Sequence, residues 1–277
     1  MIETARSNDY LIRATDTSNS FNDCKPEEIQ NWLTPLLENT KDQPPEKNQA
    51  IADFATSLAK SCNNMCKPYR AILLLSANQF TITEPISPRS IIKSIRANQQ
   101  NKLDEYLLTQ SEPGKEFDIN RIFTSIRNNQ QITKHKNNVE ECILAFKNKT
   151  YFPAALGVIA IFDGTLSDIS NDQAPKFKAR IEKILNTISG SYEHFIKNGR
   201  QNDTDFLNKN IALISFSISQ CSFFESSPFT YSEPRLINRH WIAHGRSSRC
   251  VSKLDCIKLF RLLDALLIIN ELLETPE

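Results

Sequence analysis

Hydrophobic residues recur three or four positions apart along most of the chain, and this spacing predicts a mainly α-helical protein. In the first half, the pattern marks helices within residues 26–60, around a proline-rich break, and over residues 91–109. The short apolar stretch at 69–75 fits a helix or a strand. Residues 80–90 combine β-favouring side chains with two prolines, which is typical of a loop or a short edge strand.

The second half has a clearer pattern of helices. Residues 119–129, 139–148, 176–197 and 204–224 each show helical spacing of apolar residues, and 254–273 is strongly apolar. Residues 151–169 are apolar nearly all round, which predicts a central buried helix. Pro234 suits the first turn of a further helix and Gly245 the position just past its end. Together these segments predict a bundle of about five to six helices.

The breaks between helices suggest how the chain is divided. Residues 1–25 are polar and predict a flexible arm, while residues 26–115 predict a helical N-terminal region of unknown role. The sequence SEPGKEFD at 111–118 interrupts the helical pattern, so we place a boundary there. Residues 116–277 then form the C-terminal helical bundle.

Composition excludes several classes of protein. The chain has only 6 glycines in 277 residues, about a third of average usage, and it contains neither of the glycine-rich nucleotide-binding motifs. Its longest apolar run, residues 154–162, is far shorter than the roughly 18 residues that span a membrane. The polar N-terminus lacks the apolar stretch of a signal peptide, and seven scattered cysteines are typical of reduced thiols. We therefore expect a cytoplasmic protein without a membrane segment.

Positive charge is concentrated near the end of the chain. The formal net charge is +1 overall, yet residues 234–261 hold seven basic residues against one acid, Asp255. This segment is either a solvated face or a surface that follows an RNA backbone. The candidate RNA-binding residues are Arg235, Arg246, Arg249 and Lys253.

A short motif within this segment suggests chemistry. His240 and His244 are four residues apart, which places both on one face of a helix, and Arg239 lies on a neighbouring face. With Gly245 as the helix end, the helix macrodipole favours a protonated His244. A cationic histidine beside an arginine suits a phosphodiester and the more highly charged phosphorane formed during its cleavage.

This motif resembles that of the HEPN superfamily, in which an arginine is followed after four to six residues by a histidine on a late helix. Here Arg239 is followed after four residues by His244, and His240 corresponds to the polar residue that often follows the arginine. Asp163, isolated in the run ALGVIAIFDG, fits the acidic residue that faces the motif from a long core helix. The resemblance covers residues 119–275 and is to the branch found in phage-defence and abortive-infection proteins.

The resemblance implies a metal-independent RNA endonuclease, without a cofactor, that acts on tRNA or mRNA as a homodimer with a composite cleft. It implies that Arg239 binds the scissile phosphate, that His244 acts as general acid or base, and that His240 and Asn238 orient RNA or the partner's histidine. The 2′-hydroxyl is then the nucleophile, and a 2′,3′-cyclic phosphate is left. Whether a neutralising antitoxin or an activating phage component is a further partner stays open.

Each candidate residue also has a structural interpretation. Arg239 and His244 could simply be favourable cations at a helix end, and Asp163 could form a plain structural ion pair. Trp241 fits the core or a dimer interface better than a base-stacking platform. Cys62 and Cys66 are a weak zinc candidate, Cys250 and Cys256 are better explained as structural thiols than as nucleophiles, and His135 and His194 as surface residues.

Two other functions compete with the nuclease. The same basic face could serve a non-catalytic helical module that binds RNA or a protein. Alternatively, the N-terminal region could hold a nuclease inactive until a trigger arrives.

Overall fold

The computed structural model describes residues 66–84, 86–170, 204–224, 233–234 and 236–273. Helix accounts for 74% of these residues and none of them forms a strand, so the prediction of a mainly α fold is confirmed. The helices expected within 26–60 and at 176–197, and the arm at 1–25, lie outside the described residues.

The helices follow one another along the chain with short connections where the chain is described. Their bounds are α4 Cys66–Ala77, α5 Pro88–Gln99, α6 Leu103–Gln110, α7 Ile119–Asn128, η1 Gln130–His135, α8 Lys136–Lys147, α9 Tyr151–Ser170, α11 Thr204–Phe224, α12 Arg239–Ala243 and α13 Lys253–Leu273. The ambiguous stretch at 69–75 is therefore helical.

Local sequence signals explain where these helices start and stop. The Ser87 side chain caps α5 by accepting a hydrogen bond from the N–H of Ser90, and Asp118 caps α7 by accepting one from Asn120. The single helix expected over 91–109 is divided into α5 and α6, because the chain turns at Asn101 with φ +54°. Asparagine tolerates this left-handed conformation better than most residues.

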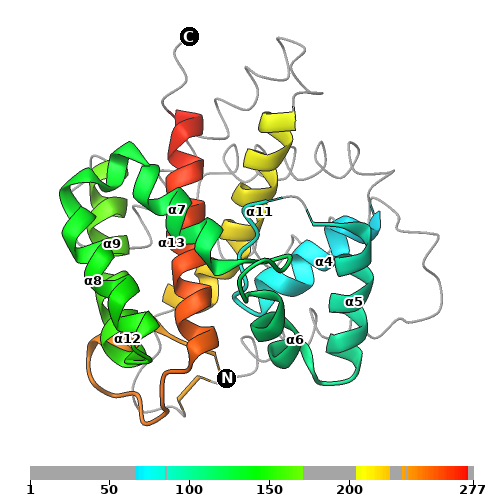
Figure 1. The fold of residues 1–277 in the computed structure, drawn as a ribbon, viewed down its shortest axis with the longest axis horizontal. Helices are drawn as coiled ribbons and strands as arrows, with labels where there is room; N and C mark the ends of the chain where they lie inside the picture. Colours follow the sequence, from blue (N-terminus) through cyan, green and yellow to red (C-terminus); the bar gives the residue numbers. More distant parts are fainter. Residues whose placement is uncertain (1–65, 85, 171–203, 225–232, 235, 274–277) are drawn as a thin grey trace, which may run out of the picture.

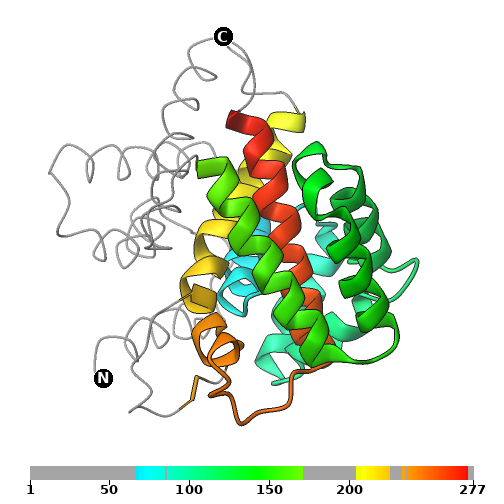
Figure 2. The same cartoon turned by 90° about the vertical axis from the view of Figure 1, so that its left-hand side faces the viewer.

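The last helix, α13, lies at the centre of the molecule. Figure 2 shows α9 and α11 running beside it, and Figure 1 shows α4–α6 on one side of it and α8 and α9 on the other. Every residue of α13 from Leu254 to Leu267 is buried, although four of them have acidic or basic side chains. The central position therefore belongs to α13 and not, as the apolar pattern predicts, to α9.

One side of α9 faces outward. Phe152 is 47% exposed and Leu156 39% exposed, while Ala155, Val158 and Phe162 on the opposite side are buried. By length and composition α9 could cross a membrane. Its buried side nevertheless packs against α8 and α13, as in the core helix of a folded domain.

The described residues on both sides of position 115 share one core. The buried cluster joins Leu75 and Leu107 to residues of α7, α9, α11 and α13. Polar contacts also cross this position: the hydroxyl of Ser215 on α11 is 2.6 Å from that of Ser76 and accepts a hydrogen bond from the N–H of Ile82 at 2.7 Å. Residues 66–115 thus complete the helical bundle from the side of α4.

Helices α8 and α9 approach closely at a glycine. A methyl group on Gly157 would overlap the Sγ atom of Cys142, whereas the next nearest atom, Cys142 Cβ, would lie at 4.0 Å. With Cys142 opposite it, position 157 therefore has no room for a side chain unless the sulfur moves.

We expect Gly157→Ala to lower the free energy of unfolding by about 1–2 kcal/mol, because overpacking outweighs the gain in helix propensity. Urea denaturation would measure the change. In a Cys142→Ala background the same substitution should cost nothing, because the overlapping sulfur is gone. Equal destabilisation in both backgrounds would contradict the close approach.

Candidate active site

The predicted motif lies on and around α12, a five-residue helix that is capped at both ends. At its start, the Asn238 side chain accepts a hydrogen bond from the N–H of Trp241 at 3.3 Å. At its end, Gly245 N donates to Ile242 O (3.0 Å) and Arg246 N to Trp241 O (2.9 Å), the pair of bonds of a Schellman motif. Gly245 has φ +64°, so its predicted place past the helix end is confirmed.

Two expectations for this segment are corrected. Pro234 does not begin a helix, because α12 starts only at Arg239, after the extended residue Asn238 that supplies the capping oxygen. Asn238 is also only 4% exposed. Its side chain is used in the core to cap α12, which is a structural position and not the expected one facing RNA.

The remaining residues of α12 divide between the core and the surface. Trp241 and Ile242 are buried, so the interpretation of Trp241 as a core residue is confirmed. Arg239 and His240 are half-buried and His244 is exposed. The buried pair anchors the short helix on α9 and α11, which it contacts, and leaves the predicted chemical groups on the outer side.

Asp163 reaches the motif from α9, as the sequence predicts. One carboxylate oxygen forms an ion pair with the Arg239 guanidinium, and both side chains are about a quarter exposed. The other oxygen, Oδ1, is buried and accepts no hydrogen bond from the described residues. A guanidinium has five N–H donors in a planar fork, so Arg239 could be oriented by Asp163 while it also binds an anion.

The two histidines are in contact. Their ring centroids are 4.7 Å apart with an interplanar angle of 70°. Burial, together with the charges of His244 and Arg239, holds the pKa of His240 below its ordinary value. A neutral imidazole is thereby favoured at position 240, and it can accept a proton near neutral pH.

The basic run that follows α12 is not one continuous charged surface. Lys258 and Arg261 are buried on α13, and Lys258 pairs with Asp104 at 3.4 Å. Of the predicted RNA-binding residues, Arg249 pairs with Asp255 at 2.5 Å, Arg246 is exposed and Lys253 is half-buried. Because Lys258 and Arg261 face the core, the cationic surface of the described residues is smaller than the sequence suggests. Arg235 lies outside the described residues.

The structure also shows the environment of the cysteines and histidines that lie outside the motif. Cys256 donates a hydrogen bond to Tyr151 O at 3.2 Å, and burial raises the pKa of its thiol to about 12, which makes it a poor nucleophile. His135 is not a surface residue, because its side chain is 19% exposed and its ring packs against Gly164. Within the described part of the chain, no three metal-binding side chains form a cluster. Cys62 and His194 lie outside it.

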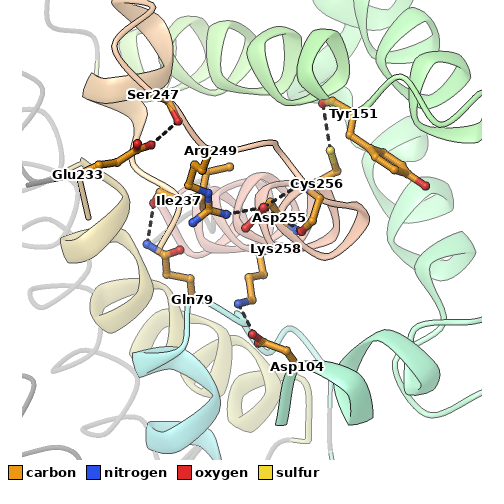
Figure 3. Close-up of polar contacts among 11 residues, drawn as sticks. Gln79, Asp104, Tyr151, Glu233, Ile237, Ser247, Arg249, Asp255, Cys256 and Lys258 are labelled. Atoms are coloured by element: carbon orange, nitrogen blue, oxygen red, sulfur yellow. Dashed lines mark hydrogen bonds and ion pairs between the residues drawn. The ribbon is translucent and has the colours of Figure 1, made fainter. Parts of the chain in front are cut away.

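Two residues that sequence reasoning missed support the motif. Gln79 donates a hydrogen bond from Nε2 to Ile237 O at 2.8 Å, just before α12, and the Glu233 carboxylate accepts one from Ser247, just after α12 (Figure 3). Glu233 also accepts a hydrogen bond from Ser248. Gln79 is 158 positions from Ile237 in the sequence, and no pattern links them. Glu233 follows the sequence SSPFTYS, where a single acidic residue gives no signal.

Comparison of the chain with known protein families, with characterised proteins and with solved structures gave no match.

We expect His244→Ala to raise the pKa of His240. The substitution removes a neighbouring charge and uncovers the ring of His240, two of the causes that lower its pKa. Titration of the histidine ring signals by NMR from pH 4 to 9 would measure the shift. An unchanged pKa for His240 would mean that the two rings do not interact in solution.

Proposed function

We propose that this protein is a metal-independent RNA endonuclease that acts in the cytoplasm as a toxin or anti-phage defence effector. The observation that supports it best is the grouping of Arg239, ion-paired with Asp163, and the two contacting histidines on one short capped helix. The HEPN-like spacing of Arg239 and His244 supports the same function, with tRNA or mRNA as substrate.

In this proposal, Arg239 binds the scissile phosphate and stabilises the charge that develops on it. Asp163 is a positioning residue that orients the guanidinium through the ion pair. His240 and His244 share the proton transfers, because their contact allows both to reach groups on one phosphodiester. The low pKa of His240 suits the base, and the exposed His244 suits the acid.

The reaction needs no metal or added water. His240 takes the proton from the 2′-hydroxyl as its oxygen attacks phosphorus and forms the new P–O2′ bond. The P–O5′ bond breaks, and the leaving 5′-oxygen takes a proton from His244. The products are a 2′,3′-cyclic phosphate and a 5′-hydroxyl end, and the two histidines have exchanged protonation states.

A homodimer would bring two copies of α12 together. Arg239, His240 and His244 of each copy could then line one cleft that is wide enough for an RNA strand. The resemblance supports this arrangement, and an antitoxin or a phage component could act on the same assembly.

We expect purified protein to cleave total bacterial RNA in excess EDTA, and the Arg239→Ala/His244→Ala variant to lose at least about 100-fold in rate, a typical loss for a general acid or base. Mapping the RNA ends would measure cleavage and identify cyclic phosphates. Arg127→Ala is a matched control, because Arg127 is similarly exposed and pairs with Glu140 between α7 and α8. Its cleavage rate should equal that of the wild type.

Equal cleavage by the wild type and the double variant would contradict the proposal. RNA that is retarded on a gel but stays intact would favour the non-catalytic binding module. If removal of residues 1–65 started cleavage by an otherwise inactive protein, the N-terminal region would be a regulator.

We expect the single-turnover cleavage rate to depend on pH through His240. The rate should rise as His240 loses its proton, with a midpoint below the ordinary value of 6.5 because burial, His244 and Arg239 lower its pKa. His240→Gln should remove the acidic limb, and an acidic limb that persisted would assign the base to another residue.

A further inference from the structure

The residues of the motif lie on a stretch of chain whose two ends meet at one carboxylate. Glu233 precedes α12 in the sequence, and Ser247 and Ser248 come after α12. These serines are 14 and 15 positions from Glu233. The carboxylate accepts a hydrogen bond from Ser247 Oγ (Figure 3). It also accepts hydrogen bonds from Ser248 N at 2.9 Å and from Ser248 Oγ at 2.6 Å. We call these three bonds the Glu233 bridge.

Both oxygens of the carboxylate take part in the bridge. Oε1 accepts from Ser247 and Oε2 accepts twice from Ser248. Desolvation raises the pKa of the Glu233 carboxyl, but hydrogen bonds from Ser247, Ser248 and the Arg249 backbone outweigh it and lower the pKa below its ordinary value. The bonds are thus made to a charged carboxylate, and such bonds are stronger than those between neutral groups.

The bridge acts on the part of the loop that carries His244. Ser247 N also donates to Trp241 O at 3.1 Å, so Ser247 is bound to α12 through its backbone and to Glu233 through its side chain. His244 and Gly245 lie in the short turn between these attachments. Further along, Arg249 pairs with Asp255, and Ser252 N donates to the same carboxylate at 2.9 Å.

The incoming end of the loop has its own attachment. The Gln79 side chain, in the turn after α4, donates a hydrogen bond to Ile237 O at 2.8 Å. Residues 237–241 are therefore fixed by the core, whereas residues 244–248 are exposed or half-buried. Closing the loop at Glu233 lowers the number of conformations that this exposed part can adopt.

We propose that Glu233 is a positioning residue that holds His244 against His240 by closing the loop from residue 233 to residue 248. In this inference the Glu233 carboxylate closes the loop and has no assigned part in proton transfer. The inference deepens the proposed function, but its structural part is independent of whether RNA is cleaved.

The test compares Glu233→Ala and Glu233→Gln with Glu116→Ala. Glu116 is a matched control, because its carboxylate also accepts a hydrogen bond from a distant backbone N–H, that of Ser87 at 2.8 Å, outside the motif. The variant Ser247→Ala/Ser248→Ala removes two donors of the bridge and leaves Glu233 in place, so it tests the same bridge if Glu233→Ala fails to fold.

We expect Glu233→Ala to speed hydrogen exchange of the amides at 243–248 about tenfold while those of α13 stay unchanged, as in local opening. The pKa of His240 should rise, because His244 is no longer held beside it. Glu233→Gln should give a smaller change, since its amide oxygen can still accept from one serine. Glu116→Ala should change neither measurement.

Cleavage supplies a separate measurement. If the wild type cleaves RNA, Glu233→Ala should lower kcat about tenfold with little change in KM, because it misplaces a catalytic group without removing one. If the wild type does not cleave, the proposed function fails, and exchange and the His240 titration still test the bridge. Unchanged exchange and unchanged His240 pKa in both the Glu233→Ala and the double-serine variants would overturn it.

Discussion

The burial of Arg261 at the centre of α13 is the constraint around which this molecule is arranged. Its side chain is fully buried, donates from Nε to Thr81 O at 2.7 Å and lies over the rings of Phe80 and Phe117 at 4.6 and 5.5 Å. Glu84 is 3.5 Å away. A guanidinium deprived of these partners would be very costly to bury, so the loops that follow α4 and α6 must close around α13. Gln79, which holds the chain before α12, belongs to one of these loops.

Asp264, one turn further along α13, shares this environment. Burial raises its pKa to about 6, although hydrogen bonds from Ser125 and Thr83 and the charge of Arg261 oppose the rise. The centre of the fold is thus polar as well as apolar. Its charged groups fix which loops face α13, while the surrounding leucines and phenylalanines supply most of the apolar area removed from water.

Helical periodicity predicted most of the described fold because it depends only on neighbours in the sequence. The predicted helix at 204–224 matches α11, and the one at 254–273 matches α13 within one residue. Which helix is central could not be read from hydrophobicity. The charged residues of α13 make it look less buried than α9, and their partners Asp104, Glu84 and Thr81 are more than 150 positions away in the sequence. Because these distant partners cannot be seen in the sequence, the basic run at 234–261 was also predicted to be a surface, although Lys258 and Arg261 face the core.

For the candidate site, local spacing predicted the contact of His240 with His244 and the turn at Gly245, and the HEPN resemblance indicated the approach of Asp163 to Arg239. Neither the spacing nor the resemblance predicted that α12 would be a single short helix, or that Glu233 and Gln79 would support it, because these contacts form only in the folded chain.

A five-residue helix such as α12 is too short to be stable alone. During synthesis, Gln79 and Asp163 emerge early, but Asp255 at the start of α13, which holds the loop after α12, emerges only after the motif itself. A nascent chain therefore carries every residue of the motif before it can arrange them, and the motif is assembled only once α13 has been made.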